Sequence, residues 1–145
     1  MFYLVVYAFA TFGAFAVMAY LDERQESVGL QDLQGLFQRS PAAAAVLSIC
    51  LLTLAGIPPT AGFFAKFYVF KVAFQAGYHA LVIVALLTTI LSAYYYLRII
   101  GVIFSSDTKH QEARTPLWPA VVTGTLSCIL LIALSFFPEY MIALL

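Results

Sequence analysis

Apolar residues along this chain are gathered into four long stretches, and most charged residues lie in the connectors between them. The stretches cover residues 2–21, 41–76, 81–104 and 118–137. A helix that crosses the hydrocarbon core of a bilayer needs ~20 predominantly apolar residues, and three of the stretches have about that length. The pattern predicts an all-α fold, a polytopic bundle of about four transmembrane helices.

The second stretch is longer than one membrane crossing and is interrupted near its middle. Gly56, Pro58, Pro59 and Gly62 fall within residues 56–62, between two apolar runs. Two prolines remove backbone donors and clash with the preceding turn, so a straight continuous helix is excluded. Two alternatives remain: two complete spans, or one span made of two half-helices with an irregular, hydrated break.

The basic residues of the two longer connectors decide between these alternatives. Residues 22–40 and 105–115 hold four of the seven basic residues: Arg24, Arg39, Lys109 and Arg114. Short basic loops stay on the cytoplasmic side of a membrane, and the two connectors share a side only if the second stretch crosses once. The sequence therefore favours a single broken crossing, with the basic loops cytoplasmic and the C-terminus periplasmic.

Two local patterns concern how these spans pack. The first span carries small residues, which let neighbouring helices approach closely. These are Ala8, Ala10, Gly13, Ala14 and Ala16. The first connector has apolar residues at helical spacing, which predict a short amphipathic helix. These are Leu30, Leu33, Leu36 and Phe37. Ser40 then precedes Pro41, the order expected of a helix N-cap and a first helical residue.

Composition strengthens the membrane interpretation. The chain has 145 residues, of which 63% are hydrophobic and 10% are charged, and its mean hydropathy is +0.97. Soluble domains are about half apolar and a quarter charged, so this composition excludes an ordinary soluble fold. The formal net charge is zero, which gives no sign of a nucleic-acid partner. Cys50 and Cys128 lie within apolar runs, where we expect small buried side chains, and no Cys/His spacing predicts a metal site.

Lys66 is the residue of the second stretch with the clearest chemistry. It lies shortly after the break, among aromatic and aliphatic residues. It could extend its amine to the interface along its aliphatic stem, but the apolar run continues beyond it, which favours a buried amine. Removal from water favours the neutral form of an amine, so such a lysine can load and release a proton. The break would supply water and half-helix ends beside it. Lys66 is our candidate for proton transfer.

Three other residues are secondary relay candidates, each with a simpler alternative. Lys71 is well placed to extend to the interface. His79 begins the third span, where an interfacial histidine is the commoner case. Thr60 could line a wet path, although hydroxyls in such helices more often bond the preceding turn.

Three runs of residues resemble a known family. They are LAGIPPTAGFFAKFYVF (54–70), SAYYYLRII (92–100) and YAFATFGAFAVMAYL (7–21). Together they resemble the antiporter-like membrane subunits of respiratory complex I, most closely subunit N of the proton-translocating NADH–quinone oxidoreductases, which corresponds to chain 2 of the mitochondrial enzyme. The broken helix with its ionisable residue is shared with the Mrp-type cation/proton antiporters.

The resemblance implies a fourteen-helix fold with two inverted repeats, of which residues 1–145 would be the C-terminal segment with the last four helices. We expect either a fragment or a naturally split chain, because the first repeat is missing. Lys66 would fall on the family's lysine in the second broken helix. The partners implied are the lipid bilayer, sister antiporter-like subunits and the remaining N-terminal helices of its own subunit.

The implied function is that of a membrane subunit of a proton-pumping NADH–quinone oxidoreductase in the bacterial inner membrane. This piece alone is not expected to be catalytic. NADH, flavin, iron–sulfur clusters and quinone would bind to other subunits, and no cofactor is expected on this chain. Two alternatives stay open: a secondary cation/proton antiporter or hydrogenase-linked subunit, and a structural membrane subunit without an active relay.

Overall fold

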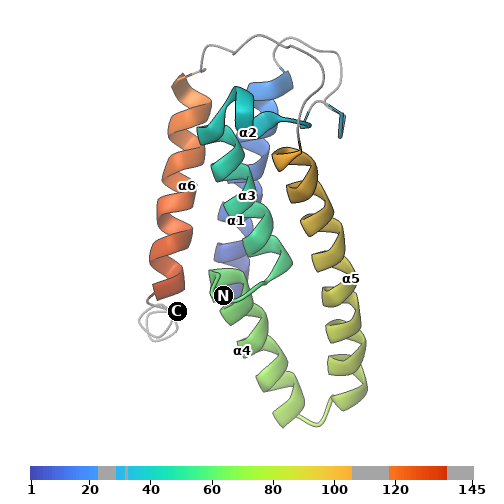
Figure 1. Cartoon of the computed structure of the whole chain (residues 1–145). Helices are drawn as coiled ribbons and strands as arrows, with labels where there is room; N and C mark the ends of the chain where they lie inside the picture. The colour runs from blue at the N-terminus through green and yellow to red at the C-terminus, as the bar shows by residue number, and fades with distance from the viewer. Residues whose placement is uncertain (23–28, 32, 106–117, 137–145) are drawn as a thin grey trace.

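The computed structural model describes residues 1–22, 29–31, 33–105 and 118–136, and in these residues helices joined by turns are the only regular secondary structure (Figure 1). The helices, in chain order, are α1 (Phe2–Asp22), α2 (Leu36–Arg39), α3 (Pro41–Ala55), α4 (Ala61–Gln75), α5 (His79–Phe104) and α6 (Trp118–Phe136). The predicted all-α class is confirmed. Arg24, Lys109 and Arg114, which carried the orientation argument together with Arg39, lie outside the described residues.

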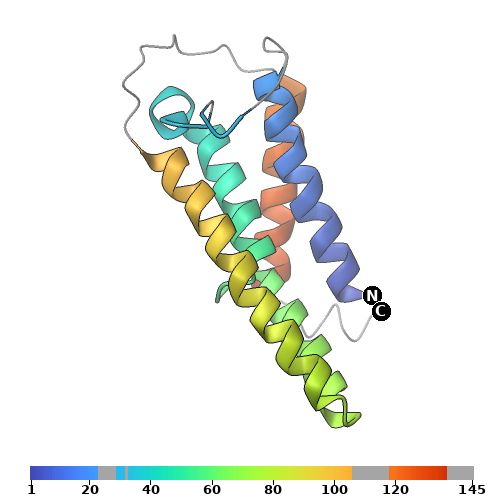
Figure 2. The same cartoon turned by 90° about the vertical axis from the view of Figure 1, so that its right-hand side faces the viewer.

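The long helices run alongside one another, and the broken segment crosses the bundle once. α1 packs against α3, α4 and α6, while α5 packs against α3 and α4. The end of α1, the end of α5 and the start of α6 lie at the same end of the bundle, next to α2 (Figures 1 and 2). α3 descends from that end to the middle, and α4 continues to the turn into α5 at the opposite end.

The interruption is shorter than the sequence suggested. α3 ends at Ala55, and Gly56 follows in the left-handed region with φ 76° and ψ 42°, a conformation that glycine adopts without strain. α4 begins at Ala61, after Thr60 as its N-cap. The break therefore covers residues 56–60 rather than 56–62, because Thr60 starts the second half-helix and Gly62 already lies within it.

Small residues bring α1 close to α3 and α6, as predicted. Ala10 is fully buried. A Cβ atom built on Gly13 would lie 2.7 Å from the Sγ atom of Cys50 and 3.1 Å from the Cβ atom of Ser127. The close approach is confirmed at these two positions, whereas Ala8 is exposed. Cys50 and Cys128 are free and buried, as expected of small core residues.

The prediction of an amphipathic helix in the first connector is largely wrong. Within the described part of the connector, only α2 is helical, and it has four residues. Leu33 and Leu36 are buried, whereas Leu30 and Phe37 are about half exposed. Leu33 lies in a turn and Leu36 begins α2, so no continuous helix carries the leucines. Ser40 does precede Pro41 at the start of α3, but its side chain makes no capping hydrogen bond.

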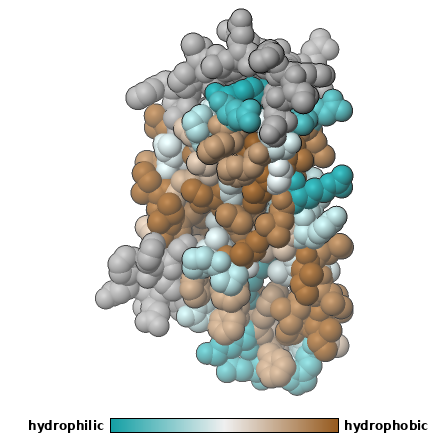
Figure 3. Space-filling view, in the orientation of Figure 1, coloured by the Kyte–Doolittle hydropathy of each residue, from teal (hydrophilic) through white to brown (hydrophobic). Residues whose placement is uncertain are grey.

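The outside of the bundle is apolar along most of its length. Figure 3 shows hydrophobic residues covering the middle of one face and hydrophilic residues gathering towards its ends. α5 contributes many exposed large side chains, among them Leu81, Ile83, Leu87, Ile90 and Leu91. By length and composition, Phe2–Ala19 and His79–Phe104 could each cross a membrane. Such a surface suits hydrocarbon or further apolar helices better than water.

Candidate functional site: Lys66 at the helix break

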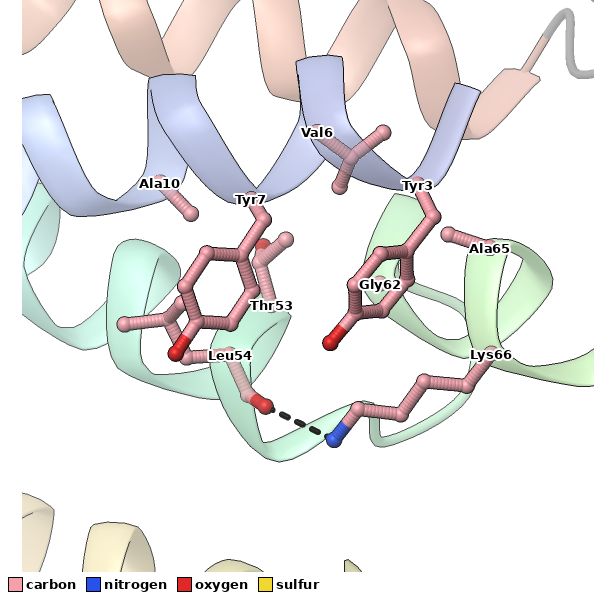
Figure 4. A pocket seen from close by; sticks show the side chains of 9 residues that line it. All are labelled: Tyr3, Val6, Tyr7, Ala10, Thr53, Leu54, Gly62, Ala65 and Lys66. Atoms are coloured by element: carbon pink, nitrogen blue, oxygen red, sulfur yellow. Dashed lines mark hydrogen bonds between the residues drawn. The ribbon is translucent and has the colours of Figure 1, made fainter. Parts of the chain in front are cut away.

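The side chain of Lys66 reaches back from α4 across the break to the end of α3. Its Nζ atom donates hydrogen bonds to the carbonyl oxygens of Leu54, at 2.9 Å, and Ala55, at 3.2 Å. Figure 4 shows the amine turned towards the last turn of α3. Lys66 is partly buried. Its amine thus sits at the break, between the two ends of the bundle.

The two carbonyl groups that Lys66 contacts are those at the end of α3 that receive no hydrogen bond from a backbone N–H. The last four carbonyls of a helix have no partner within it. The backbone N–H of Gly56 donates to the carbonyl oxygens of Leu52, at 3.0 Å, and Thr53, at 3.1 Å. Lys66 supplies donors for the remaining pair. The carbonyl end of a helix also carries a partial negative charge, which favours a cation there. Lys66 is therefore a side-chain cap that joins the two half-helices.

Two glycines leave the space that this arrangement needs. A Cβ atom on Gly56 would lie 3.0 Å from the Cδ atom of Lys66 and 3.3 Å from its Nζ atom. A Cβ atom on Gly62 would overlap the carbonyl oxygen of Thr53. Gly56 therefore makes room for the lysine stem, and Gly62 lets α4 lie directly on the backbone of α3.

Thr60 and Thr53 direct their hydroxyls to the backbone. The Oγ1 atom of Thr60 accepts a hydrogen bond of 3.4 Å from the N–H of Phe63, as an N-cap does. The Oγ1 atom of Thr53 donates to the carbonyl oxygen of Ile49 at 2.9 Å. Both hydroxyls thus take part in the ends of the half-helices, and the relay role considered for Thr60 stays a prediction.

A small cavity lies between α1 and the break. Its lining includes Lys66, Gly62 and Thr53, together with Tyr3 and Tyr7 of α1. The space open to the centre of a water molecule is about 10 Å³. In Figure 4 the hydroxyl of Tyr3 points towards the Lys66 amine, and that of Tyr7 points towards Leu54.

Several residues that the sequence singled out do not line this cavity. Pro58 and Pro59 are exposed within the break. Lys71 is exposed, further along α4. His79 is exposed at the start of α5, where its ring lies edge-on to that of Phe74 with 4.5 Å between the ring centroids. The structure therefore joins Lys66 to Gly56 and Gly62 but not to the secondary relay candidates. No group of three His, Cys, Asp or Glu residues in the described chain could hold a metal ion.

Sequence reasoning missed Tyr3 and Tyr7. Their spacing of four residues places them on one face of a helix, and their ring centroids are 5.7 Å apart. That spacing is the feature of the sequence from which a shared face for Tyr3 and Tyr7 could have been predicted. It does not say which neighbour the face meets, so only the packing of α1 against α3 and α4 connects these tyrosines to Lys66.

Comparison with known proteins identifies the family. A family model described as "NADH:quinone oxidoreductase/Mrp antiporter, TM" matches residues 1–92. The chain belongs to this family. NADH-quinone oxidoreductase subunit N of Protochlamydia amoebophila is 69% identical over 137 residues, which are 94% of this chain and 28% of that protein. Subunit N of Deinococcus radiodurans is 42% identical over 95% of this chain and 28% of its own length.

Solved structures agree with this assignment. A chain of respiratory complex I from Thermus thermophilus superimposes with a TM-score of 0.82 and 34% identity, covering 94% of this chain and 31% of that one. A chain of the Mrp complex from Dietzia sp. DQ12-45-1b gives a TM-score of 0.83 at 21% identity, covering 97% and 34%, and shares the fold. The chain is thus an integral membrane protein that holds about a third of the antiporter-like fold of these relatives. The resemblance seen in the sequence is confirmed.

Proposed function

We propose that this chain is part of a membrane subunit of a proton-pumping NADH–quinone oxidoreductase, and that Lys66 loads and releases a proton at the helix break. The observation that carries the proposal is the position of the Lys66 amine on the free carbonyl end of a half-helix. The high identity to subunit N relatives supports the assignment to an oxidoreductase complex.

The hydrogen bonds of Lys66 suit a group that changes its protonation. An ammonium group has three N–H donors, and two of them are used by Leu54 and Ala55. The third remains for a water molecule. After losing that proton the amine still has two N–H donors and gains a lone pair that can accept. Lys66 can therefore exchange a proton with water while its two bonds to α3 persist.

The setting of the break favours such an exchange. The partial negative charge at the end of α3 stabilises the ammonium form, while partial burial among apolar side chains opposes it. A proton carrier has to be held in both its charged and its neutral form, and this setting supplies one influence in favour of each. The proposal also includes a secondary relay role for Lys71, His79 and Thr60, although these residues do not line the cavity.

The membrane placement proposed is the bacterial inner membrane, with the basic connectors cytoplasmic and the C-terminus periplasmic. NADH, flavin, iron–sulfur clusters and quinone would bind to other subunits of the complex. The chain spans under a third of its relatives' length, so the other helices of the antiporter-like fold and the sister subunits are the expected partners.

The second candidate is a cation/proton antiporter, which the shared fold with the Mrp chain allows. The two differ in their driving force. An oxidoreductase subunit pumps protons when NADH is oxidised. An antiporter exchanges protons for sodium ions across the membrane and needs no NADH. The higher identity to complex I relatives favours the first.

The test replaces Lys66 with methionine, which keeps an unbranched stem and removes the amine. The variant is made in the protein as the cell assembles it, and inverted membrane vesicles are assayed for NADH oxidation and for proton uptake with a pH-sensitive dye. We expect proton uptake to fall about tenfold or more, since general acid–base groups contribute about 10²–10⁴ to rates. Lys66→Arg, which keeps the charge but does not give up its proton, should fail to restore it.

Lys71→Met provides the comparison, because it removes the same group from an exposed position of the same helix. Its effect should be smaller. Native gel electrophoresis checks that each complex assembles. Undiminished pumping by an assembled Lys66→Met complex would show that the relay proposal is wrong and would favour a structural subunit. Sodium-driven proton movement without NADH would favour the antiporter.

A further inference from the structure

The hydroxyl group of Tyr3 is the side-chain group of α1 that is aimed at the Lys66 amine (Figure 4). Tyr3 is partly buried and packs against the core of the bundle. Its ring stacks on that of Tyr7 at an interplanar angle of 27°. The ring is therefore packed among its neighbours, and its hydroxyl faces the small cavity beside the break.

The cavity is just large enough for one water molecule and brings two polar side-chain groups to it. A site that holds water needs at least about 10–15 Å³ open to its centre and two to four polar partners. The cavity offers about 10 Å³. The hydroxyl of Tyr3 and the third N–H of Lys66 are two such partners, and the remaining lining is mainly apolar. Water there would connect α1 to the break.

We propose that Tyr3 exchanges protons with Lys66 through one water molecule in this cavity, so that α1 carries the next step of the proton path. The inference rests on the proposed proton-transfer role of Lys66. A phenol suits the task because its oxygen can accept a hydrogen bond and its O–H can donate one. Phenylalanine has the same ring and neither capacity.

The transfer is balanced in protons and charge. The ammonium group of Lys66 gives one proton to the water oxygen, and that water gives one of its own protons to the Tyr3 oxygen. Tyr3 at the same time releases its hydroxyl proton to water outside this cavity, which then carries the positive charge. One positive charge has then left Lys66, and both Tyr3 and the cavity water are neutral as before. The reverse sequence reloads the amine.

The test is Tyr3→Phe in the assembled complex, measured in the same vesicles. The stack on Tyr7 is kept and only the hydroxyl is lost. We expect NADH-driven proton uptake to slow about five- to tenfold, and its solvent deuterium isotope effect to rise, because proton transfer becomes the slow step. A purely structural defect would lower the amount of assembled complex without changing the isotope effect. Tyr94→Phe, at a side chain of α5 that is 69% exposed, is the matched control.

Lys66→Met is assayed in parallel, which separates this inference from the proposed function. If Lys66→Met loses pumping and Tyr3→Phe slows it with a raised isotope effect, the relay through Tyr3 is supported. If Lys66→Met loses pumping while Tyr3→Phe matches Tyr94→Phe, the function of Lys66 stands and the role of Tyr3 is overturned. If the Lys66→Met complex pumps normally, both the proton-transfer role of Lys66 and the relay through Tyr3 are wrong.

Discussion

Replacing Gly62 with alanine should separate the two half-helices. A Cβ atom at this position would overlap the carbonyl oxygen of Thr53 and lie 2.7 Å from its carbonyl carbon, where ordinary contact begins near 3.4 Å. α4 must therefore withdraw from α3 by at least about 0.7 Å, the difference between these two distances, and by more to clear the carbonyl oxygen. Forcing an extra methyl group into a packed contact costs about 1–3 kcal/mol.

The same displacement would weaken the contacts of Lys66. Its bonds to Leu54 and Ala55 are 2.9 Å and 3.2 Å long, and lengthening either one by ~0.7 Å takes it beyond hydrogen-bonding distance. Hydrogen bonds from a charged donor contribute about 1.5–3 kcal/mol each. Gly62→Ala should therefore lower the melting temperature of the detergent-solubilised complex by several degrees and reduce proton pumping together.

Gly101→Ala is the matched control for this substitution. Gly101 also lies within a long helix, α5, and a Cβ atom there would meet no atom within 4 Å. Alanine is the better helix former by about 1 kcal/mol, so this variant should be as stable as the parent or slightly more stable. If Gly62→Ala melts and pumps like Gly101→Ala, the close approach of α4 to Thr53 is not what holds the break.

Two further pairs of substitutions test the ends of the half-helices. Gly56→Ala and Gly77→Ala both force a side chain into the left-handed region, at φ 76° and 85°, and each should cost about 1–2 kcal/mol. Only Gly56→Ala should also reduce pumping, because its Cβ atom would crowd Lys66, whereas that of Gly77 meets nothing; equal pumping by the two variants would contradict this contact. Thr60→Ala should lower stability by about 0.5–1 kcal/mol through loss of the N-cap, and Thr60→Ser should retain it. Equal melting temperatures for these two Thr60 variants would show that the long 3.4 Å bond to Phe63 contributes nothing.

The family and the broken helix could be predicted because both depend on local chemistry. Apolar runs of about membrane length exclude a soluble fold, and Pro58 with Pro59 excludes a continuous helix. Lys66 could be singled out because a charged amine within an apolar span costs free energy, whatever the span packs against. The end of the break could not be predicted in the same way, because Thr60 and Gly62 both also suit a loop. With Thr60 as its N-cap, α4 begins at Ala61.

The amphipathic helix expected at Leu30 to Phe37 shows how spacing alone can mislead. Apolar residues three or four positions apart suit a helix, but here Leu33 is buried from a turn and Leu36 from the four-residue α2. Phe37 packs on Phe104, with 4.9 Å between the ring centroids, outside any extended helix. The end of α5 that supplies this contact is nearly seventy positions away along the chain.

The number of apolar stretches, the place of the interruption and the unusual position of Lys66 can all be read from neighbouring residues. This is so because length, backbone donors and side-chain charge act over a few neighbouring residues. The partners of Lys66 and the side chains that face it follow from the packing of the helices. The carbonyls of Leu54 and Ala55 become its partners because Gly62 lets α4 lie on α3, and Tyr3 reaches the cavity because α1 packs across both half-helices. Those contacts depend on how separate helices cross, which no single stretch of sequence records.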